Sequence, residues 1–282
     1  MSSHPTAAKP LTAPDIQAAK GERKLCMITA YDYPAALLAD ASGVDMILVG
    51  DSLAMVVLGH EDTLSVSMDE MVHHTRAASR GTSRALLVAD MPFLSYQADV
   101  AEAVRNAGRF LSEGHARAIK LEGGKDYAPH VAAMVRAGIP VMAHLGLTPQ
   151  YVATLGGFKA QGKSAQAARA MLDDAKAMED AGAFSIVLEC IPEETAALIT
   201  EAVSIPTIGI GAGKSTDGQV LVLHDLLGLF DRFVPRFVKQ YAQIGQLITE
   251  TLQRYCADVR SGAFPAEEHT MHLANGEREK LA

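Results

Sequence analysis

Eight short and almost wholly apolar runs recur along the chain, and they limit its fold more than any other feature of the sequence. The runs are 24–30, 44–50, 84–90, 115–122, 139–146, 183–189, 205–213 and 219–225. Near-continuous apolar runs are typical of strands that are buried on both faces of a parallel sheet. We therefore expect eight buried parallel strands.

Ala-rich stretches dotted with charged residues separate most of these runs, as in AQAARAMLDDAKAMEDAGA at 165–183. Such stretches predict helices, and the alternation of strands with helices predicts βαβ units. Eight such strands in 282 residues favour an α/β fold of the (β/α)8 TIM barrel type. In that fold the active site lies at the mouth formed by the C-terminal ends of the strands. An open doubly wound sheet is the alternative.

The sequence contains no repeat or low-complexity linker that would divide it, so we expect a single barrel domain over residues 1–282. Residues 1–12 and 262–282 are polar and small, and we expect them to form loose tails. The amphipathic stretch 236–259 follows the last expected strand and predicts a final outer helix.

Charge and cysteine content exclude several classes of protein. The formal net charge of −8 disfavours a nucleic-acid partner. The three cysteines are widely spaced and form no CxxC pair, which fits a reduced compartment. No apolar run approaches the ~18 residues that a membrane span requires, and the N-terminus lacks the apolar segment of a signal peptide. We expect a cytoplasmic protein that binds neither membrane nor nucleic acid.

Acidic residues end four of the expected strands: Asp51, Asp90, Glu122 and Glu189. In a barrel all four would surround one mouth. Four independent helix caps or turns are the alternative explanation. Like charges gathered in one pocket repel each other unless a cation neutralises them, and Mg²⁺ prefers oxygen ligands. The pattern therefore favours a magnesium site.

Three other residues near the expected mouth could take part in chemistry. Lys120 precedes Glu122 by two positions, so both point to one face, where the lysine either pairs with a neighbouring acid or binds a substrate carboxylate. His144 ends the fifth run as a site residue or as part of the wall. Cys190 follows Glu189 directly and should turn away from the mouth, which makes it a weak nucleophile candidate.

The glycine-rich stretch GIGAGKST at 209–216 is similar to part of a P-loop, but Ile208 occupies the position of the first required glycine. It follows the seventh expected strand, where barrels commonly bind anions. It is either such an anion site or a turn that needs positive φ angles.

Several motifs resemble the ketopantoate hydroxymethyltransferase family and occur in the family's order, from about Lys24 to Tyr241. They are TAYDYP at 29–34, ILVGDS at 47–52, MVVLGH at 55–60, KLEGG at 120–124, AHLGLTPQ at 143–150, GGFKAQGKS at 156–164, and GIGAG with TDGQVLV within 209–222. Ala54 and SVSMDEM at 65–71 depart slightly from the family pattern, and neither change removes a residue with chemistry.

The resemblance implies a (β/α)8 barrel that transfers a one-carbon unit from 5,10-methylenetetrahydrofolate to 3-methyl-2-oxobutanoate. The product would be 2-dehydropantoate, in the first step of pantothenate biosynthesis. The family uses Mg²⁺ and forms large homo-oligomers, commonly decamers. Small-molecule oxoacid and folate substrates would then be the protein's partners.

The resemblance also implies a role for each residue at a matching motif position. Asp51, Asp90 and Glu122 match the magnesium ligands. Ser52, together with Asp51, Asp90 and Lys120, matches the positions that bind the oxoacid. Glu189 matches the glutamate that abstracts the substrate proton.

Two rival functions remain at this point. Mg²⁺-dependent oxoacid lyases and mutases, of the isocitrate lyase and phosphoenolpyruvate mutase type, also carry acids at strand ends. Lyases of that class use a cysteine in a Lys-Lys-Cys-Gly-His context, which this sequence lacks. A binding protein without turnover would be expected to lose one of the four acids or Lys120, and all five are present.

Overall fold

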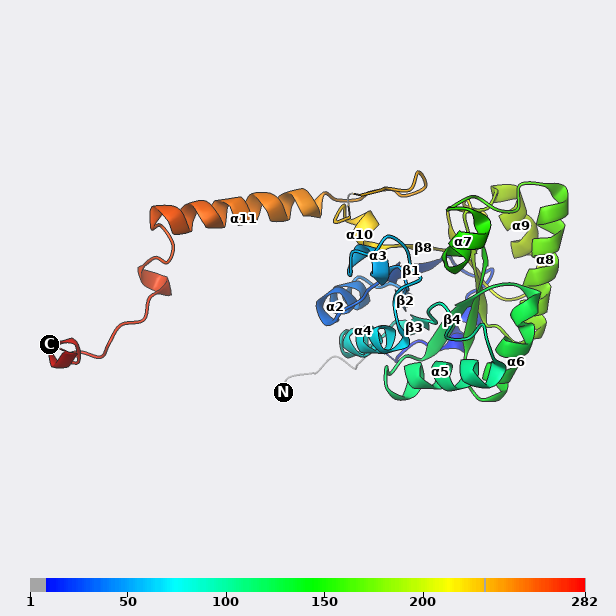
Figure 1. Ribbon diagram of the computed structural model, residues 1–282, viewed down its shortest axis with the longest axis horizontal. Coiled ribbons are helices and arrows are strands. Elements are labelled where there is room, and N and C mark those ends of the chain that lie inside the picture. Colours follow the sequence, from blue (N-terminus) through cyan, green and yellow to red (C-terminus); the bar gives the residue numbers. More distant parts are fainter. Residues whose placement is uncertain (1–8, 231, 282) are drawn as a thin grey trace. The chain divides into compact units, whose positions relative to one another are not determined.

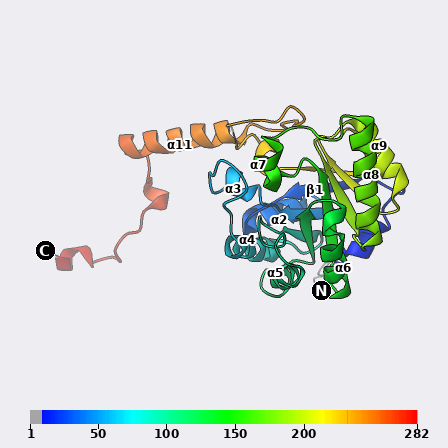
Figure 2. The ribbon, with the colours of Figure 1, turned by 45° about the vertical axis from the view of Figure 1, so that its right-hand side comes forward.

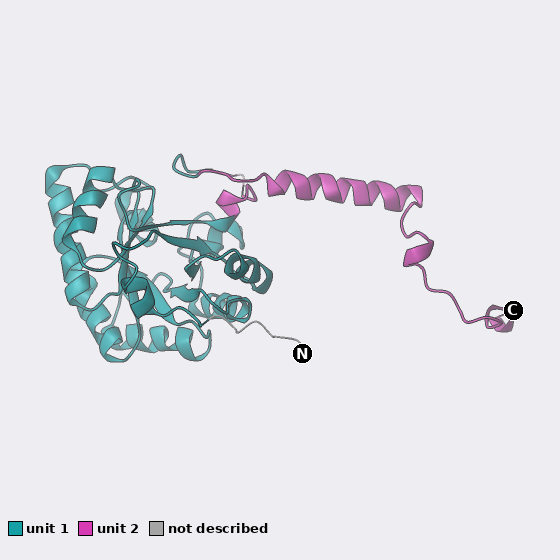
Figure 3. Ribbon diagram, turned by 180° about the vertical axis from the view of Figure 1, so that it is seen from behind, with its two compact units in different colours: residues 1–223, 235–238 teal, residues 224–234, 239–282 magenta. Residues whose placement is uncertain are grey.

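The computed structural model describes residues 9–230 and 232–281. The chain divides into two compact units, Met1–Leu223 with Pro235–Val238, and His224–Val234 with Lys239–Ala282 (Figure 3). The first unit contains every strand of the described chain, and the second contains the last long helix.

The eight strands of the first unit form a closed barrel in chain order, and every neighbouring pair is parallel (Figure 1). They are β1 (Leu25–Thr29), β2 (Met46–Val49), β3 (Leu86–Asp90), β4 (Ala118–Glu122), β5 (Val141–Gly146), β6 (Ser185–Glu189), β7 (Thr207–Ile210) and β8 (Gly218–Leu221). Seven strands lie within the predicted apolar runs. The eighth strand, β8, begins one residue before its run, and the end of that run belongs to the short helix α10 (Leu223–Leu226). The (β/α)8 prediction is confirmed, and the open sheet is excluded.

Helices surround the strands of this unit on the outside (Figure 2). The long ones are α2 (Tyr33–Ala41), α4 (Met68–Gly81), α5 (Val100–Ser112), α6 (Ala128–Arg136), α8 (Ala165–Asp180) and α9 (Glu193–Ala202). Shorter ones are α1 (Ala13–Gln17), α3 (Leu53–Val56), α7 (Val152–Leu155), η1 (Lys125–Tyr127), η2 (Pro149–Tyr151) and α10 (Leu223–Leu226), which begins in this unit and ends in the second. Helix α8 confirms the helix predicted within 165–183.

Local sequence explains why several of these helices start where they do. The side chains of Asp32, Ser67, Asp99 and Ser164 each accept a hydrogen bond from a backbone N–H in the first turn of the helix that follows. Such N-caps satisfy amides that have no partner inside the helix.

Apolar side chains fill the barrel interior toward the N-terminal ends of the strands. Met46, Val88 and Ile208 belong to one buried cluster with other inward-facing strand residues. Ala13 and Ile16 of α1 belong to the same cluster, and Ile16 is completely buried. Helix α1 therefore closes the N-terminal end of the barrel with apolar contacts.

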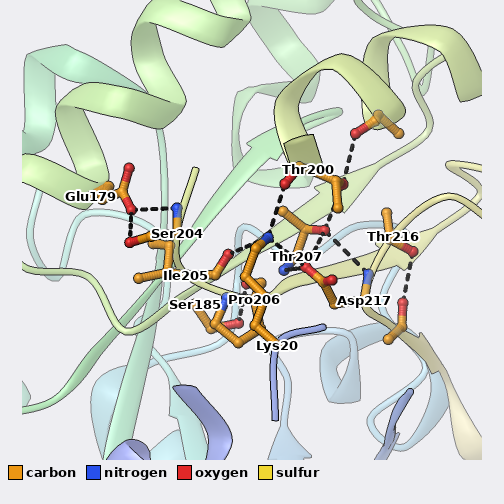
Figure 4. A network of polar contacts seen from close by, with 12 residues as sticks. Lys20, Glu179, Ser185, Thr200, Ser204, Ile205, Pro206, Thr207, Thr216 and Asp217 are labelled. Carbon is orange, nitrogen blue, oxygen red and sulfur yellow. Dashed lines mark hydrogen bonds and ion pairs between the residues drawn. The ribbon is translucent and has the colours of Figure 1, made fainter. Parts of the chain in front are cut away.

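A polar network joins the turn that follows α1 to the barrel at this N-terminal end (Figure 4). Lys20 Nζ donates to the carbonyls of Thr200 and Ile205, at 2.9 and 3.0 Å, and to Asp217 Oδ2 at 2.9 Å. Asp217 Oδ2 also accepts the backbone N–H of Thr207 at 2.9 Å. Because each charge here has partners within the fold, we interpret this network as structural.

The second unit contains α11 (Ile244–Ser261) and the short helices η3 (Glu267–His269) and η4 (Arg278–Leu281). The predicted last helix exists, but it begins eight residues later than expected. The backbone amides of Tyr241 and Ile244 bond to the carbonyls of Leu226 and Leu227, at 2.8 and 2.9 Å. These tertiary bonds hold the preceding segment out of the helix. None of the described residues of α11 is buried.

The structure describes only part of the two predicted tails. Residues 1–8 lie outside the described residues. Leu11 donates its N–H to the carbonyl of Arg84 at 2.7 Å, and Thr12 forms a capping box with Asp15 at the start of α1. At the other end, Gly262 ends α11 in a left-handed conformation with φ of 75°, and residues 263–281 are mainly exposed.

Candidate active site

The four predicted acids lie at the C-terminal mouth of the barrel, where three of them end strands and Asp51 follows β2 by two residues. Asp51, Asp90 and Glu122 are 4%, 1% and 0% exposed, and the Glu189 side chain is 18% exposed. In the sheet, Asp90 lies beside Lys120, and Glu122 lies beside His144. Parallel strands with this register gather charged side chains that lie far apart in the sequence.

Lys120 pairs with Asp90. Its Nζ donates to both carboxylate oxygens, at 2.7 and 2.6 Å, and both side chains are almost fully buried. Burial alone would lower the pKa of Lys120, but the charges of Asp90, Glu122 and Asp51 raise it above its ordinary value. The sequence left two roles open for Lys120, and the structure shows the first, an ion pair with a neighbouring acid.

Negative charge exceeds positive charge in this pocket. Burial, followed by repulsion from Asp90 and Glu122, raises the pKa of Asp51 well above its ordinary value. Burial also raises the pKa of Asp90, although the charge of Lys120 opposes that shift. Three buried carboxylates share one lysine, so the pocket favours additional positive charge.

His144 confirms the expectation that it faces the mouth. Its Nε2 lies 3.2 Å from Glu189 Oε2, and its Nδ1 lies 3.5 Å from Glu122 Oε1, although neither contact has hydrogen-bond geometry. Burial and the charge of Lys120 lower the pKa of His144, but the two glutamates outweigh them and raise it to about 9. His144 therefore lies between Glu189 and the acid cluster.

Ser52 lies at the edge of the pocket, where it begins α3. Its Oγ is 2.9 Å from the hydroxyl of Tyr31, and the side chain is half-buried. The carbonyl of Tyr31 is in turn 2.7 Å from Nδ1 of His74. On α4, His74 is half-buried by this contact, whereas the neighbouring His73 is exposed.

Two polar residues of the mouth, Gln150 and Tyr96, are not among the site residues predicted from the sequence. Gln150 is 2% exposed, and its amide donates to Asp51 Oδ2 at 2.9 Å. Tyr96 is fully buried, and its hydroxyl accepts the backbone N–H of Glu122 at 3.1 Å. Neither residue ends a strand, and neither carries a charge, so the strand-end pattern could not find them. Gln150 does close the family motif AHLGLTPQ.

The acids fit a divalent cation that takes some of its ligands from elsewhere. Within residues 9–230 and 232–281, no three His, Cys, Asp or Glu side chains are already arranged to hold one metal ion. Glu122 Oε1 is nevertheless buried without a hydrogen bond. Mg²⁺ commonly binds one or two protein carboxylates and completes its octahedron with water and substrate oxygens. The free oxygen and the excess negative charge suit such an ion.

The glycine-rich turn after β7 favours the turn interpretation over an anion site. Gly211 and Gly213 have φ of 64° and 77°, a region that L-residues rarely adopt. A Cβ on Gly213 would lie 2.6 Å from the Glu193 side chain, whose carboxylate accepts a hydrogen bond from Ser215 at 3.1 Å. A carboxylate at this turn would repel an anion.

Cys190 is a poor nucleophile in this environment. Burial, with a smaller contribution from the charge of Glu189, raises its pKa to about 12. The residue has a φ of 47° directly after β6, where the strand conformation ends. Its thiol therefore stays protonated at neutral pH, which agrees with the prediction that Cys190 is a weak candidate for a nucleophile.

A closed parallel barrel with clustered acids and a buried lysine at its C-terminal mouth defines a (β/α)8 protein with a charged pocket at the position where this fold places its active site. The family model described as ketopantoate hydroxymethyltransferase matches residues 10–267. The chain belongs to this family, and it is therefore a transferase enzyme.

Relatives support this assignment over almost the whole chain. A 3-methyl-2-oxobutanoate hydroxymethyltransferase from Syntrophobacter fumaroxidans is 61% identical, with 96% of both chains covered. The protein of the same name from Oleidesulfovibrio alaskensis is 58% identical, and the match covers 99% of this chain and 96% of that protein.

Solved structures with the same fold are much more distant in sequence. Phosphonopyruvate hydrolase is 15% identical with a TM-score of 0.61, covering 96% of this chain and 95% of its own. Phosphoenolpyruvate phosphomutase from Streptomyces platensis subsp. rosaceus is 15% identical with a TM-score of 0.62, covering 96% and 97%. These likenesses concern the fold alone. The family match favours the transferase over the lyase or mutase alternative.

Proposed function

We propose that this enzyme transfers a hydroxymethyl unit from 5,10-methylenetetrahydrofolate to 3-methyl-2-oxobutanoate and forms 2-dehydropantoate, the first step of pantothenate biosynthesis. The observation that carries the proposal is the buried cluster of Asp51, Asp90, Glu122 and Lys120 at the barrel mouth of a chain in this family. A 2-oxoacid offers adjacent keto and carboxylate oxygens, which suit a cation held by carboxylates.

Asp51, Asp90 and Glu122 are the proposed ligands of Mg²⁺. When bound, the ion would act as a Lewis acid on the keto oxygen of the substrate and make the neighbouring C–H more acidic. The raised pKa of Asp51, caused by burial and by its acidic neighbours, supports this proposal, because a cation relieves that repulsion. Ser52 and Lys120, with Asp51 and Asp90, are proposed to hold the oxoacid.

Glu189 is proposed to remove the C3 proton of the oxoacid. Its carboxylate is partly exposed at the mouth, within reach of a bound molecule, whereas the other three acids are buried. His144 Nε2 lies 3.2 Å from this carboxylate. The C–H electron pair forms an enolate, whose C3 bonds to the methylene carbon as one of its two C–N bonds to the folate breaks. Water then supplies the hydroxyl oxygen to that carbon as the second C–N bond breaks, and tetrahydrofolate leaves. A positioned general base of this kind typically contributes about 10²–10⁴-fold to the rate.

An assay with 3-methyl-2-oxobutanoate, 5,10-methylenetetrahydrofolate and Mg²⁺ tests the proposal. We expect 2-dehydropantoate to form, and we expect activity to disappear without the folate or after chelation of the metal. Cleavage or rearrangement of an oxoacid in the absence of folate would instead support the lyase or mutase alternative.

Two wider expectations stay predictions, namely a homo-oligomer, with the decamer as the expected size, and a cytoplasmic location. Among the described helices, none combines the length and the apolar character that crossing a bilayer demands.

A further inference from the structure

Gln150 is a buried amide that the proposed chemistry does not use, yet it bonds two of the mouth acids. It lies in η2, directly after β5, and its Nε2 donates to Asp51 Oδ2 at 2.9 Å and to the carbonyl of Met91 at 2.8 Å. Its backbone N–H donates to Glu122 Oε2 at 3.0 Å. One residue therefore contacts carboxylates that follow two different strands.

The orientation of this amide is determined by its surroundings. Gln150 Oε1 accepts a hydrogen bond from Gln97 Nε2 at 2.9 Å and lies 3.0 Å from the hydroxyl of Tyr96. Exchanging the amide oxygen and nitrogen would place an oxygen beside the Asp51 carboxylate and the Met91 carbonyl, where both neighbours are acceptors. The two donors of the amide consequently stay directed at these oxygens.

Gln150 and Lys120 hold the acids in different ways. Lys120 covers both oxygens of Asp90 with a positive charge. Gln150 instead bonds one oxygen each of Asp51 and Glu122 through neutral donors, which orient a carboxylate without cancelling its charge. The second oxygen of Glu122 is left buried without a hydrogen bond.

We propose that Gln150 is a positioning residue for the acid cluster, which holds Asp51 and Glu122 so that one oxygen of each stays available to a divalent cation and its oxoacid. The side chain acts through these acids and does not itself touch the substrate. The proposal rests on the proposed function for the identity of the oxoacid, but not for the binding of the cation.

Two variants and a matched control test this role. Gln150→Met keeps the length of the side chain and the backbone N–H but removes the amide. Gln150→Glu keeps the shape and places a carboxylate against Asp51. Gln97→Met removes one bond to Gln150 Oε1 but no bond to an acid. Each protein is measured for thermal unfolding, for Mn²⁺ binding by electron paramagnetic resonance, for oxoacid binding by calorimetry with saturating Mg²⁺, and for kcat and KM.

We expect Gln150→Met to weaken both Mn²⁺ and oxoacid binding by at least tenfold and to raise KM in step, with kcat within about threefold of the wild type. Gln150→Glu should weaken oxoacid binding at least as much, and it provides the same measurement if Gln150→Met does not fold. Gln97→Met should stay within twofold of the wild type.

The proposal is overturned if the Gln150 variants bind Mn²⁺ within twofold of the wild type, or if Gln97→Met loses as much affinity at a similar stability. A wild-type protein that binds Mn²⁺ but neither binds nor converts the oxoacid would refute the proposed function. The Mn²⁺ affinities would still decide the role of Gln150.

Discussion

Two buried carboxylates at opposite ends of this barrel have pKa values shifted in opposite directions. Asp40, near the N-terminal end of the strands, accepts hydrogen bonds from the backbone amides of Ser83, Arg84 and Ala85. Burial opposes its ionisation, but these bonds lower its pKa overall. Asp51 at the mouth has acidic neighbours instead, and its pKa is raised. An acid that the fold satisfies is structural, whereas one left in repulsion indicates a binding site.

Replacing Glu189 should separate proton transfer from binding. In deuterated water the wild type should exchange the C3 hydrogen of 3-methyl-2-oxobutanoate without folate, which proton NMR detects. Glu189→Gln keeps the size and polarity but removes the base, so we expect exchange to fall by about 10²–10⁴-fold while oxoacid affinity changes little. A loss of affinity in step with exchange would make Glu189 a binding residue.

Replacing Lys120 should affect the oxoacid more than the metal. Lys120→Ala removes the buried positive charge beside Asp90, so oxoacid binding should weaken at least tenfold while Mg²⁺ affinity is kept. Lys20→Ala is the control, because it breaks a comparable ion pair with Asp217 at the opposite end of the barrel. Calorimetry measures both affinities. An unchanged oxoacid Kd, with a stability loss of about 3–5 kcal/mol, would leave Lys120 with a purely structural role.

At the scale of elements, the site depends on where strands end and on how their starts are tied together. Asp40 belongs to α2, but it accepts hydrogen bonds from the backbone amides of residues that lead into β3. The fold thus positions the start of a strand with a helix side chain. Asp90 lies at the C-terminal end of the same strand, and the parallel register of β3 with β4 sets it beside Lys120.

Removing this connection should destabilise the barrel in a pH-dependent way. Asp40→Ala leaves amides unsatisfied and should lower the free energy of unfolding by about 1–3 kcal/mol at pH 7. The folded-state pKa of Asp40 lies below the ordinary 3.8, so its contribution is present above that pH and is lost as the pH falls through the folded value. Urea unfolding from pH 7 to 3 measures the difference, with the exposed Asp173→Ala as control. A difference that stays constant with pH would contradict this account.

At the scale of the whole molecule, α11 carries a stripe of exposed apolar residues. Ile248, Leu252, Tyr255 and Val259 recur at helical spacing and are 46%, 57%, 53% and 46% exposed. Such a stripe on one face of an 18-residue helix is typical of a surface that another chain covers. It supports the prediction of a homo-oligomer.

Sedimentation velocity should therefore give a mass several times the 29.9 kDa of one chain, with a decamer as the expected species. Leu252→Asp with Tyr255→Asp should shift the protein to smaller species, because the charges disrupt an apolar interface. Gln253→Asp adds a charge to the same helix outside the stripe and should leave the mass unchanged. A wild-type protein that sediments as a monomer would refute the prediction.

Strand positions, barrel closure and the acids of the mouth could all be predicted from the sequence. Apolar runs and helical spacing are local properties, and the C-terminal ends of parallel strands necessarily meet at one edge. This rule alone places Asp51, Asp90, Glu122 and Glu189 together at the mouth. The same rule placed His144 at the mouth.

Only the tertiary structure decided which of these groups touch. Lys120 could have met several partners, and the register of β3 and β4 sets it on Asp90. Gln150 reaches Asp51 across 99 residues of sequence, because the segment after β5 folds back over the mouth. The start of α11 likewise depends on backbone bonds to Leu226 and Leu227, which override local helix propensity. Contacts between distant residues depend on register and loop path, and no local pattern encodes either.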